Sequence, residues 1–475
     1  MLKELKKIKS SSFLFLLYVL IVVLLIVGNY SYTNLGFAED SDSRAIVESF
    51  YGSHNGYLPS RVLGVPLYEE ISRYLYDLGG LKALNIYSYT LWLLSIISIF
   101  LIFNFLNLKY KLFFSLAFGF HPLIVINSTI PMETMQSLFL SIIFLYASIR
   151  YYYEKNNIYL YLAVLFGILA TLTRPDNIFL VFTLFLFFII TKKNDKKMYI
   201  SGIFFCVFVP LVFILKYNFF VSFSGVSLFP VIDLRYLVRF FLSPTYLFGI
   251  FVFPLIFFLK YFNVFPYRKH EKNTYSKSLK YLLIIATIVY IVRWAILPDE
   301  IEYLINYFLI FFIFIVLNLN YKFLMFIFLS IYSQFIFVPY LLEKDITYQN
   351  NNIENKYSFS PGITTGILNQ NNIIRNSNQN VIQKDFIEKI KFVPPLEAKI
   401  SSIEFPPYLN AILLNNRTLI TGLVGLSQIF KQPKDELQRK NIYLCSTNII
   451  PNRGWRSFQK IQSIDYSKPI TCKKI

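Results

Sequence analysis

The stretch GFAEDSDSRAIVESFYGSHNGYLPSRVLGVPLYEEISRYLYDLG, residues 36–79, is a long polar insertion near the start of a chain that is otherwise mostly apolar. It holds the densest acidic cluster of the sequence, Glu39, Asp40 and Asp42. After the cluster, apolar residues recur at helical spacing in two short segments, which predicts two amphipathic helices. Helices of this kind, placed directly after a membrane span, lie on the membrane surface.

The second of these helices has clear start and stop signals, with Pro66 just inside its start and Gly79 past its end. A proline-bounded link carrying Arg61 precedes it. An acidic cluster and an arginine held at the bilayer surface indicate chemistry on a phosphate-bearing lipid. The apolar faces are formed by Ile46, Val47, Phe50 and Tyr51 in the first helix and by Leu67, Ile71, Tyr74, Leu75 and Leu78 in the second.

The composition is that of an integral membrane protein. Of the 475 residues, 55% are hydrophobic, 19% aromatic and only 15% charged, far from the average of soluble globular proteins. The formal net charge of +19 would suggest nucleic acid in a soluble protein. Here much of the excess falls in short loops between apolar runs, where it sets topology. We therefore expect no nucleic-acid partner.

Apolar runs predict an all-α polytopic fold with about eleven transmembrane helices of roughly 20 residues. Lysine and arginine gather in alternate loops, on the side of the N-terminus, which places that side in the cytoplasm and the residue 29–85 loop outside. An odd number of spans also places the C-terminus outside. The predicted spans are 13–28, 86–106, 112–128, 134–152, 158–173, 177–191, 198–216, 241–260, 281–297, 304–320 and 323–341.

The transmembrane domain is expected to cover residues 1–341, and a small extracytoplasmic domain residues 342–475. The start of this tail, to about Asn380, is low in apolar residues and reads as a loop. Near the end, NIYLCSTNII, SFQKIQSIDY and PITCKKI alternate like short strands, which favours a mixed α/β or β domain. Cys445 and Cys472 share the tail and could form a disulfide in an oxidising compartment.

Three acidic residues are candidates for catalysis: Asp40, Asp42 and Glu133. A carboxylate at the membrane surface could take the proton from an acceptor hydroxyl while a sugar leaves its lipid phosphate. The simpler explanation of Asp42 is a helix N-cap, and that of Glu133 is a charge that complements the dipole of the following helix. If Glu133 converged on Asp40, the pair could act as acid and base or hold a divalent cation.

Arginine suits forked contacts with phosphate oxygens. Five arginines lie on or near the extracytoplasmic side, and interfacial snorkelling explains most of them. Arg61 and Arg174 are the best candidates for substrate binding because each lies in a turn that contains proline. His54 and His121 stand alone without ligand spacing, so we assign no metal ligand to either.

Five segments, taken in order and on the expected membrane side, resemble the GT-C superfamily of membrane glycosyltransferases, which includes protein O-mannosyltransferases and the aminoarabinose transferases of lipid A. Together they cover roughly residues 1–340. They are Glu39-Asp40-Ser41-Asp42, YLPSRVLGVPLYE (Tyr57–Glu69), PMET with Glu133, GILATLTRPDN (Gly167–Asn177) and LPDEIEYLIN (Leu297–Asn306).

The resemblance implies an inverting transfer of a hexose or pentose from a polyprenyl-phosphate or dolichyl-phosphate carrier, with a first-loop aspartate as general base. Asp40 best matches the leading acid, and Asp42 is the second choice. The related branches carry an adjacent Asp-Glu pair there, whereas this chain reads Glu-Asp followed by Ser-Asp. The expected substrate-binding residues are Glu39, Arg61, Glu69, Arg174, Asp299 and Glu302.

We therefore expect a glycosyltransferase that acts on a glycan, lipid or protein acceptor at the extracytoplasmic face, among membrane lipids. A divalent cation, Mg²⁺ or Mn²⁺, stays open as a cofactor. A bacterial inner membrane is favoured, with the endoplasmic reticulum membrane as the eukaryotic equivalent. The alternatives are a lipid-linked sugar flippase or transporter, and a non-catalytic scaffold. The apolar spans contain almost no acidic residue at mid-membrane depth, which disfavours a proton-coupled or ion-coupled transporter.

Overall fold

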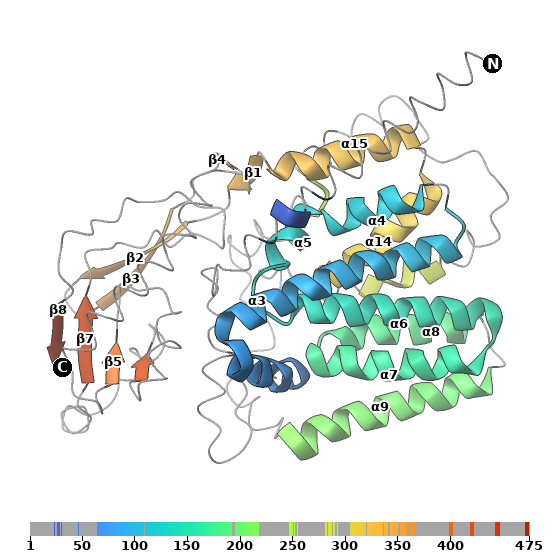
Figure 1. Cartoon of the computed structure of the whole chain (residues 1–475), viewed down its shortest axis with the longest axis horizontal. Coiled ribbons are helices and arrows are strands. Elements are labelled where there is room, and N and C mark those ends of the chain that lie inside the picture. The colour runs from blue at the N-terminus through green and yellow to red at the C-terminus, as the bar shows by residue number, and fades with distance from the viewer. Residues whose placement is uncertain are drawn as a thin grey trace.

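A computed structural model of the chain describes most of the helical part and short strands of the tail (Figure 1). The described residues are 23, 26–28, 30, 46, 64–108, 110–191, 195–217, 247–249, 251, 254, 281–282, 284–286, 288–289, 292, 305–319, 321–335, 337–340, 343–349, 352–358, 362–365, 399–401, 419–421, 442–446 and 471–474.

The longest helix, α3 (Pro66–Phe105), consists of two helical segments joined at a sharp bend. Pro66 occupies the first turn, as the sequence predicts, and the bend lies at Gly79 and Gly80. Gly80 has φ 62° and ψ −154°, a conformation that is open almost only to glycine. The predicted helix before Gly79 is therefore confirmed, and Figure 1 shows it at an angle to the longer segment that follows.

The other helices follow the predicted apolar runs closely. The predicted run 112–128 forms two helices, because the chain breaks at Phe120 and restarts at Pro122, where proline favours a helix start. The helices are α4 (Lys111–Gly119), α5 (Pro122–Asn127), α6 (Thr134–Glu154), α7 (Asn157–Thr173), α8 (Asn177–Thr191), α9 (Lys196–Tyr217), α14 (Ile305–Asn318) and α15 (Tyr321–Tyr332).

The last predicted span, 323–341, is wrong at its end. Helix α15 stops at Tyr332, a short 3-10 turn follows, and residues Phe337–Tyr340 form strand β1. Pro339 lies in this segment, and proline is not tolerated in a helix interior, since it lacks a backbone N–H and clashes with the preceding turn.

Helix α6 is the centre of the bundle and packs against α3 and α7, while α14 contacts α6 and α8. The core is rich in aromatic side chains, among them Trp92, Phe103, Phe118 and Phe312, all nearly or fully buried. Phe103 on α3 and Phe118 on α4 both contact Phe312 on α14, with ring centroids 6.3 and 5.3 Å apart. These contacts join segments about two hundred residues apart in the sequence.

Among the described residues, one helical segment, Lys82–Phe105, is both long and apolar enough to cross a bilayer. The shorter apolar helices are Asn157–Thr173, Asn177–Phe188, Tyr199–Phe213, Phe308–Leu317 and Phe323–Tyr332. The count of eleven spans stays a prediction, because much of 13–28, 241–260 and 281–297 lies outside the described residues.

Eight strands are described in and just before the tail. β2 and β3 form a hairpin within the stretch up to Asn380 that we expected to be a loop, so that expectation is wrong there. β7 and β8 agree with two segments predicted as strands. The remaining strands are β2 (Glu343–Gln349), β3 (Asn352–Ser358), β4 (Gly362–Thr365), β5 (Lys399–Ser401), β6 (Leu419–Thr421), β7 (Ile442–Ser446) and β8 (Thr471–Lys474).

The sheet formed by β6, β5, β7 and β8 mixes parallel and antiparallel pairing. β7 and β8 are antiparallel, with Cys445 directly opposite Cys472 in the register. The predicted domain boundary at residues 341 and 342 stays a prediction.

Candidate functional site

The first segment of α3 has three distinct faces. Leu67, Ile71 and Leu75 are half-buried, and Tyr74 and Leu78 are each 66% exposed, although all five belong to the predicted apolar face. Glu70 and Asp77 form an exposed charged face. Exposed apolar residues beside exposed charges are typical of a helix lying on a membrane.

The third face of this helix is polar and points into the protein. Tyr68 and Ser72 are fully buried, and Glu69 is 3% exposed. The sequence predicted Glu69 as a substrate-binding residue but gave no sign that Tyr68 and Ser72 would be buried. A helix on the surface of a soluble protein buries its apolar face and exposes its polar face. In this segment the arrangement is reversed. The interior next to this segment is therefore polar.

Tyr68 is the centre of this polar region. It packs against Ile46 of the first loop and stacks on Tyr87 of the second segment of α3, with ring centroids 6.4 Å apart. Burial raises the pKa of Tyr68, and the charge of Glu133 raises it further. The phenol of Tyr68 is therefore neutral at physiological pH, and it lies near enough to Glu133 to feel its charge.

Glu133 is the residue before the first turn of α6, and its side chain makes no capping bond. It is 1% exposed, and its Oε1 lies 3.8 Å from Nε of Arg174, which is 3% exposed. The same Nε lies 3.2 Å from Oδ1 of Asp176. The α6 N-terminus and the α7–α8 turn are thus joined through a buried arginine between two carboxylates. The structure brings together two predicted site residues, Glu133 and Arg174, with Glu69 on a neighbouring buried face.

A chain of hydrogen bonds links this charged group to Tyr87. The Tyr87 hydroxyl donates to Oε1 of Gln136 at 2.8 Å, and Nε2 of Gln136 donates to Oγ1 of Thr173 at 2.9 Å. Thr173 directly precedes Arg174, so the bonds connect α3, α6 and α7 at one level of the bundle. Gln136 follows Glu133 by about one helical turn, so its position in the sequence is the signal that places it on the same side of α6.

A second network begins at the next residue of α6, Ser137. Nδ2 of Asn306 donates to Oδ1 of Asn177 at 2.6 Å and to Oγ of Ser137 at 2.8 Å, and all three residues are buried. Asn177 and Asn306 end two of the segments that carried the family resemblance. The network fixes the N-termini of α8 and α14 against α6. We call the part of the bundle that holds Glu133, Arg174, Asn177 and Asn306 the outer end.

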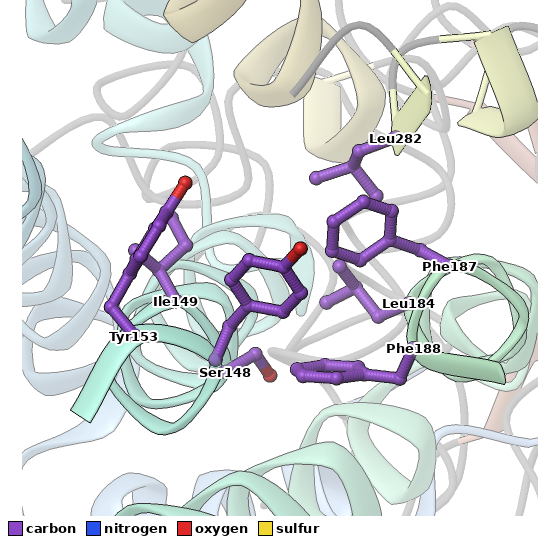
Figure 2. A pocket seen from close by; sticks show the side chains of 8 residues that line it. Ser148, Ile149, Tyr153, Leu184, Phe187, Phe188 and Leu282 are labelled. Atoms are coloured by element: carbon purple, nitrogen blue, oxygen red, sulfur yellow. The ribbon is translucent and has the colours of Figure 1, made fainter. Parts of the chain in front are cut away.

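The opposite end of the bundle, the inner end, carries the basic residues that predicted a cytoplasmic side. Lys155 pairs with Asp195 at 2.6 Å, and Arg150 pairs with Glu154 at 2.7 Å. Figure 2 shows a pocket near this end, lined mostly by aromatic and aliphatic side chains of α6 and α8, with the hydroxyls of Ser148 and Tyr153 among its labelled residues. None of its lining residues is a carboxylate, histidine, lysine or arginine.

Six of the predicted site residues lie outside the described residues: Glu39, Asp40, Asp42, Arg61, Asp299 and Glu302. His121 is described, and both its ring nitrogens are bonded, Nδ1 to the N–H of Leu123 and Nε2 to the carbonyl of Leu247. It is a buried histidine whose two ring nitrogens both have hydrogen-bond partners within the core. Within the described part of the chain, no three histidine, cysteine, aspartate or glutamate residues are grouped as a metal site would need.

The chain matches no known protein-family profile and no curated protein. Among solved structures, it is similar to the crystal structure of ArnT from Cupriavidus metallidurans in the apo state, with 12% sequence identity and a TM-score of 0.43. The match covers 63% of this chain and 59% of that one. The likeness is distant, so the case for a function comes from this chain's own residues.

Proposed function

We propose that this protein is an integral membrane glycosyltransferase. It moves one sugar, a hexose or pentose, from a polyprenyl-phosphate carrier to a glycan, lipid or protein acceptor at the extracytoplasmic face. The bound carrier phosphate lies at the membrane surface, between the first loop and the outer end of the bundle. A bacterial inner membrane, with the outer end facing the periplasm, is the proposed location.

The contact between Ile46 and Tyr68 carries this proposal. Only four positions separate Asp42 from Ile46, and four extended residues reach at most about 14 Å. This short separation supports our proposal that the acidic motif of the first loop acts at the same end of the bundle as Glu133 and Arg174. Acidic residues and an arginine, buried beside a helix with an exposed apolar face, suit a reaction between a lipid-linked phosphate and a polar acceptor.

Asp40 is the proposed general base, with Asp42 as the second choice. Its carboxylate takes the proton of the acceptor hydroxyl as the hydroxyl oxygen attacks the anomeric carbon of the sugar. The bond between that carbon and the phosphate oxygen breaks, and the carrier phosphate leaves with the electron pair. Attack from the face opposite the leaving phosphate inverts the anomeric configuration.

Glu133 and Arg174 have proposed supporting roles. Arg174 offers a guanidinium fork that suits phosphate oxygens, and Glu133 holds that side chain at the outer end. Arg61, Glu39, Glu69, Asp299 and Glu302 are proposed to contact substrate. A divalent cation held by carboxylates of the first loop and Glu133 is also compatible with this residue set, because Mg²⁺ and Mn²⁺ prefer oxygen ligands.

Transfer of labelled sugar from a panel of polyprenyl-phosphate donors by the purified protein in liposomes tests the proposal. Asp40→Asn is expected to lower transfer about 10² to 10⁴-fold, the usual contribution of a general base. Glu154→Gln, at the far end of α6 from Glu133, is the matched control and should keep full activity. A parallel sample with chelator decides the metal question.

Two results would contradict the proposal. Full activity of both Asp40→Asn and Asp42→Asn would remove the mechanism. Labelled lipid that crosses to the opposite leaflet without donor consumption would favour a flippase instead. If the protein is a non-catalytic scaffold, wild type and variants alike should consume no donor, and no labelled lipid should cross the membrane.

A further inference from the structure

Three buried hydroxyl groups of α3 have no hydrogen-bond partner: those of Tyr68, Ser72 and Ser88. All three residues have 0% exposure. The hydroxyls of Ser72 and Ser88 lie close enough to the Tyr68 phenol to offset part of the rise in its pKa that burial causes. None of the three oxygens meets the distance and angle of a hydrogen bond with any partner. The three groups converge because the bend at Gly79 and Gly80 turns the first segment of α3 against the second.

Such an arrangement destabilises the folded protein. A buried polar group without a partner costs about 1–3 kcal/mol, and most buried polar groups in proteins are satisfied. Ser141 and Ser148 on α6 also lack partners, but Ser148 lies among apolar side chains (Figure 2). The hydroxyls around Tyr68, by contrast, come from both segments of α3 and lie near the charge of Glu133. Such a cluster suggests a ligand that supplies the missing hydrogen bonds.

The chemistry of the cluster selects the class of ligand. Hydroxyl groups both donate and accept hydrogen bonds, and burial keeps the phenol of Tyr68 protonated by raising its pKa. An anionic ligand would be repelled by the nearby charge of Glu133. A metal ion prefers carboxylate oxygens as ligands, whereas the three groups of this cluster are neutral hydroxyls. A ligand that carries several hydroxyl groups of its own satisfies the cluster without adding charge.

We propose that Tyr68, Ser72 and Ser88 form the subsite that binds the hydroxyl groups of the transferred sugar. This inference rests on the proposed function and adds the residues that distinguish a sugar-bearing carrier from the bare carrier phosphate. The cluster is closed to solvent, so the sugar enters when the first segment of α3 moves about Gly79 and Gly80. Tyr68 and Glu133 then lie beside the sugar, and the carrier phosphate lies toward Arg174.

Binding of undecaprenyl-phosphate hexoses and pentoses, compared with bare undecaprenyl phosphate, tests the inference on the full chain in nanodiscs. The measured quantity is the ratio of the two affinities. Tyr68→Phe and the double variant Ser72→Ala, Ser88→Ala should each lower this ratio about tenfold, the loss of one or two hydrogen bonds. Ser148→Ala is the matched control, since it removes an equally buried serine hydroxyl without a partner at the inner end, and should leave the ratio unchanged.

Thermal unfolding of the ligand-free variants gives an independent readout. Tyr68→Phe removes an unsatisfied polar group and keeps the ring, so the melting temperature should stay equal or rise. A fall would mean that the hydroxyl is bonded in the free protein, for example to a buried water, and would overturn the inference.

Three binding results are also decisive. If wild type prefers a sugar-bearing carrier and the variants keep that preference, the subsite is wrong while the proposed function stands. If the variants lose affinity for both carriers equally, the cluster positions the carrier and not the sugar, which also overturns the inference. If wild type binds no sugar-bearing carrier better than the bare one, both proposals fall.

Discussion

The two ends of α6 both carry charged residues, but they differ in burial. At the inner end, Lys155 is 45% exposed and pairs with Asp195. At the outer end, Glu133 and Arg174 are 1% and 3% exposed. Taking two charges out of water is expensive and is often not repaid by their attraction. The inner charges therefore serve solubility and topology, whereas the burial of the outer charges indicates a function.

The same difference extends to neutral groups. The outer end gathers side-chain hydrogen bonds that join α3, α6, α7, α8 and α14. The pocket close to the inner end is lined mainly by aromatic and aliphatic side chains, such as Phe187 and Phe188 (Figure 2). Polar residues placed deep in a membrane protein face its interior and mark functional sites. The comparison thus points to the outer end for chemistry.

The largest effect is expected from Arg174→Ala, which leaves the Glu133 and Asp176 carboxylates without this counter-ion. Removing one partner of a buried ion pair costs about 3–5 kcal/mol, measured as a fall in unfolding stability in detergent. Adding Glu133→Gln should restore part of the lost stability, because it removes the buried charge. An Arg174→Ala protein as stable as wild type would break the comparison between the two ends.

The cysteines of the tail test which side of the membrane the outer end faces. Directly opposite residues in an antiparallel pair have Cα atoms about 4.5–5.5 Å apart, within the range that a disulfide spans. We expect Cys445 and Cys472 to be disulfide-bonded in protein from cells, which contributes about 3 kcal/mol to the stability of the tail. Thiol labelling without reductant should detect Cys206 alone. Three labelled thiols would place the tail in a reducing compartment.

An intermediate effect is expected at the bend of α3. Gly80→Ala forces a side chain into a backbone conformation available almost only to glycine, at a cost of about 1–3 kcal/mol. Because the bend brings Tyr68 toward Ser88, sugar transfer should fall together with stability. Gly28→Ala is the control, since a Cβ there meets no atom within 4 Å. If Gly80→Ala and Gly28→Ala have the same stability and the same rate of sugar transfer, the bend has no special role.

The smallest effect is expected from Lys155→Ala at the inner end. Its ion pair with Asp195 is partly exposed, and such pairs contribute about 0–1 kcal/mol. Donor consumption in liposomes should stay at the wild-type level. A stability loss as large as that of Arg174→Ala would show that exposure does not separate the two ends, and the functional interpretation of the outer charges would lose its basis.

The sequence by itself determined most of the described helices, the start of α3 and the end of its first segment at Gly79. Apolar periodicity and the helix start and stop signals of Pro66 and Gly79 are local features, so they do not depend on how the rest of the chain packs. The sequence also named Glu69, Glu133 and Arg174 as candidates, because charged residues in proline-containing or surface segments of an apolar chain stand out. It failed at β1, where the hydrophobic run outweighed the signal of Pro339.

Only the tertiary structure decided which faces of these helices are buried. The apolar face of the first α3 segment is partly exposed and its Tyr68 face is buried, a reversal that periodicity cannot detect because it reports amphipathicity and not the side that contacts protein. Asn306 meets Asn177 across more than a hundred residues of sequence. Such contacts depend on how distant helices pack, which is why the hydroxyl cluster and the buried ion pair emerged only from the fold.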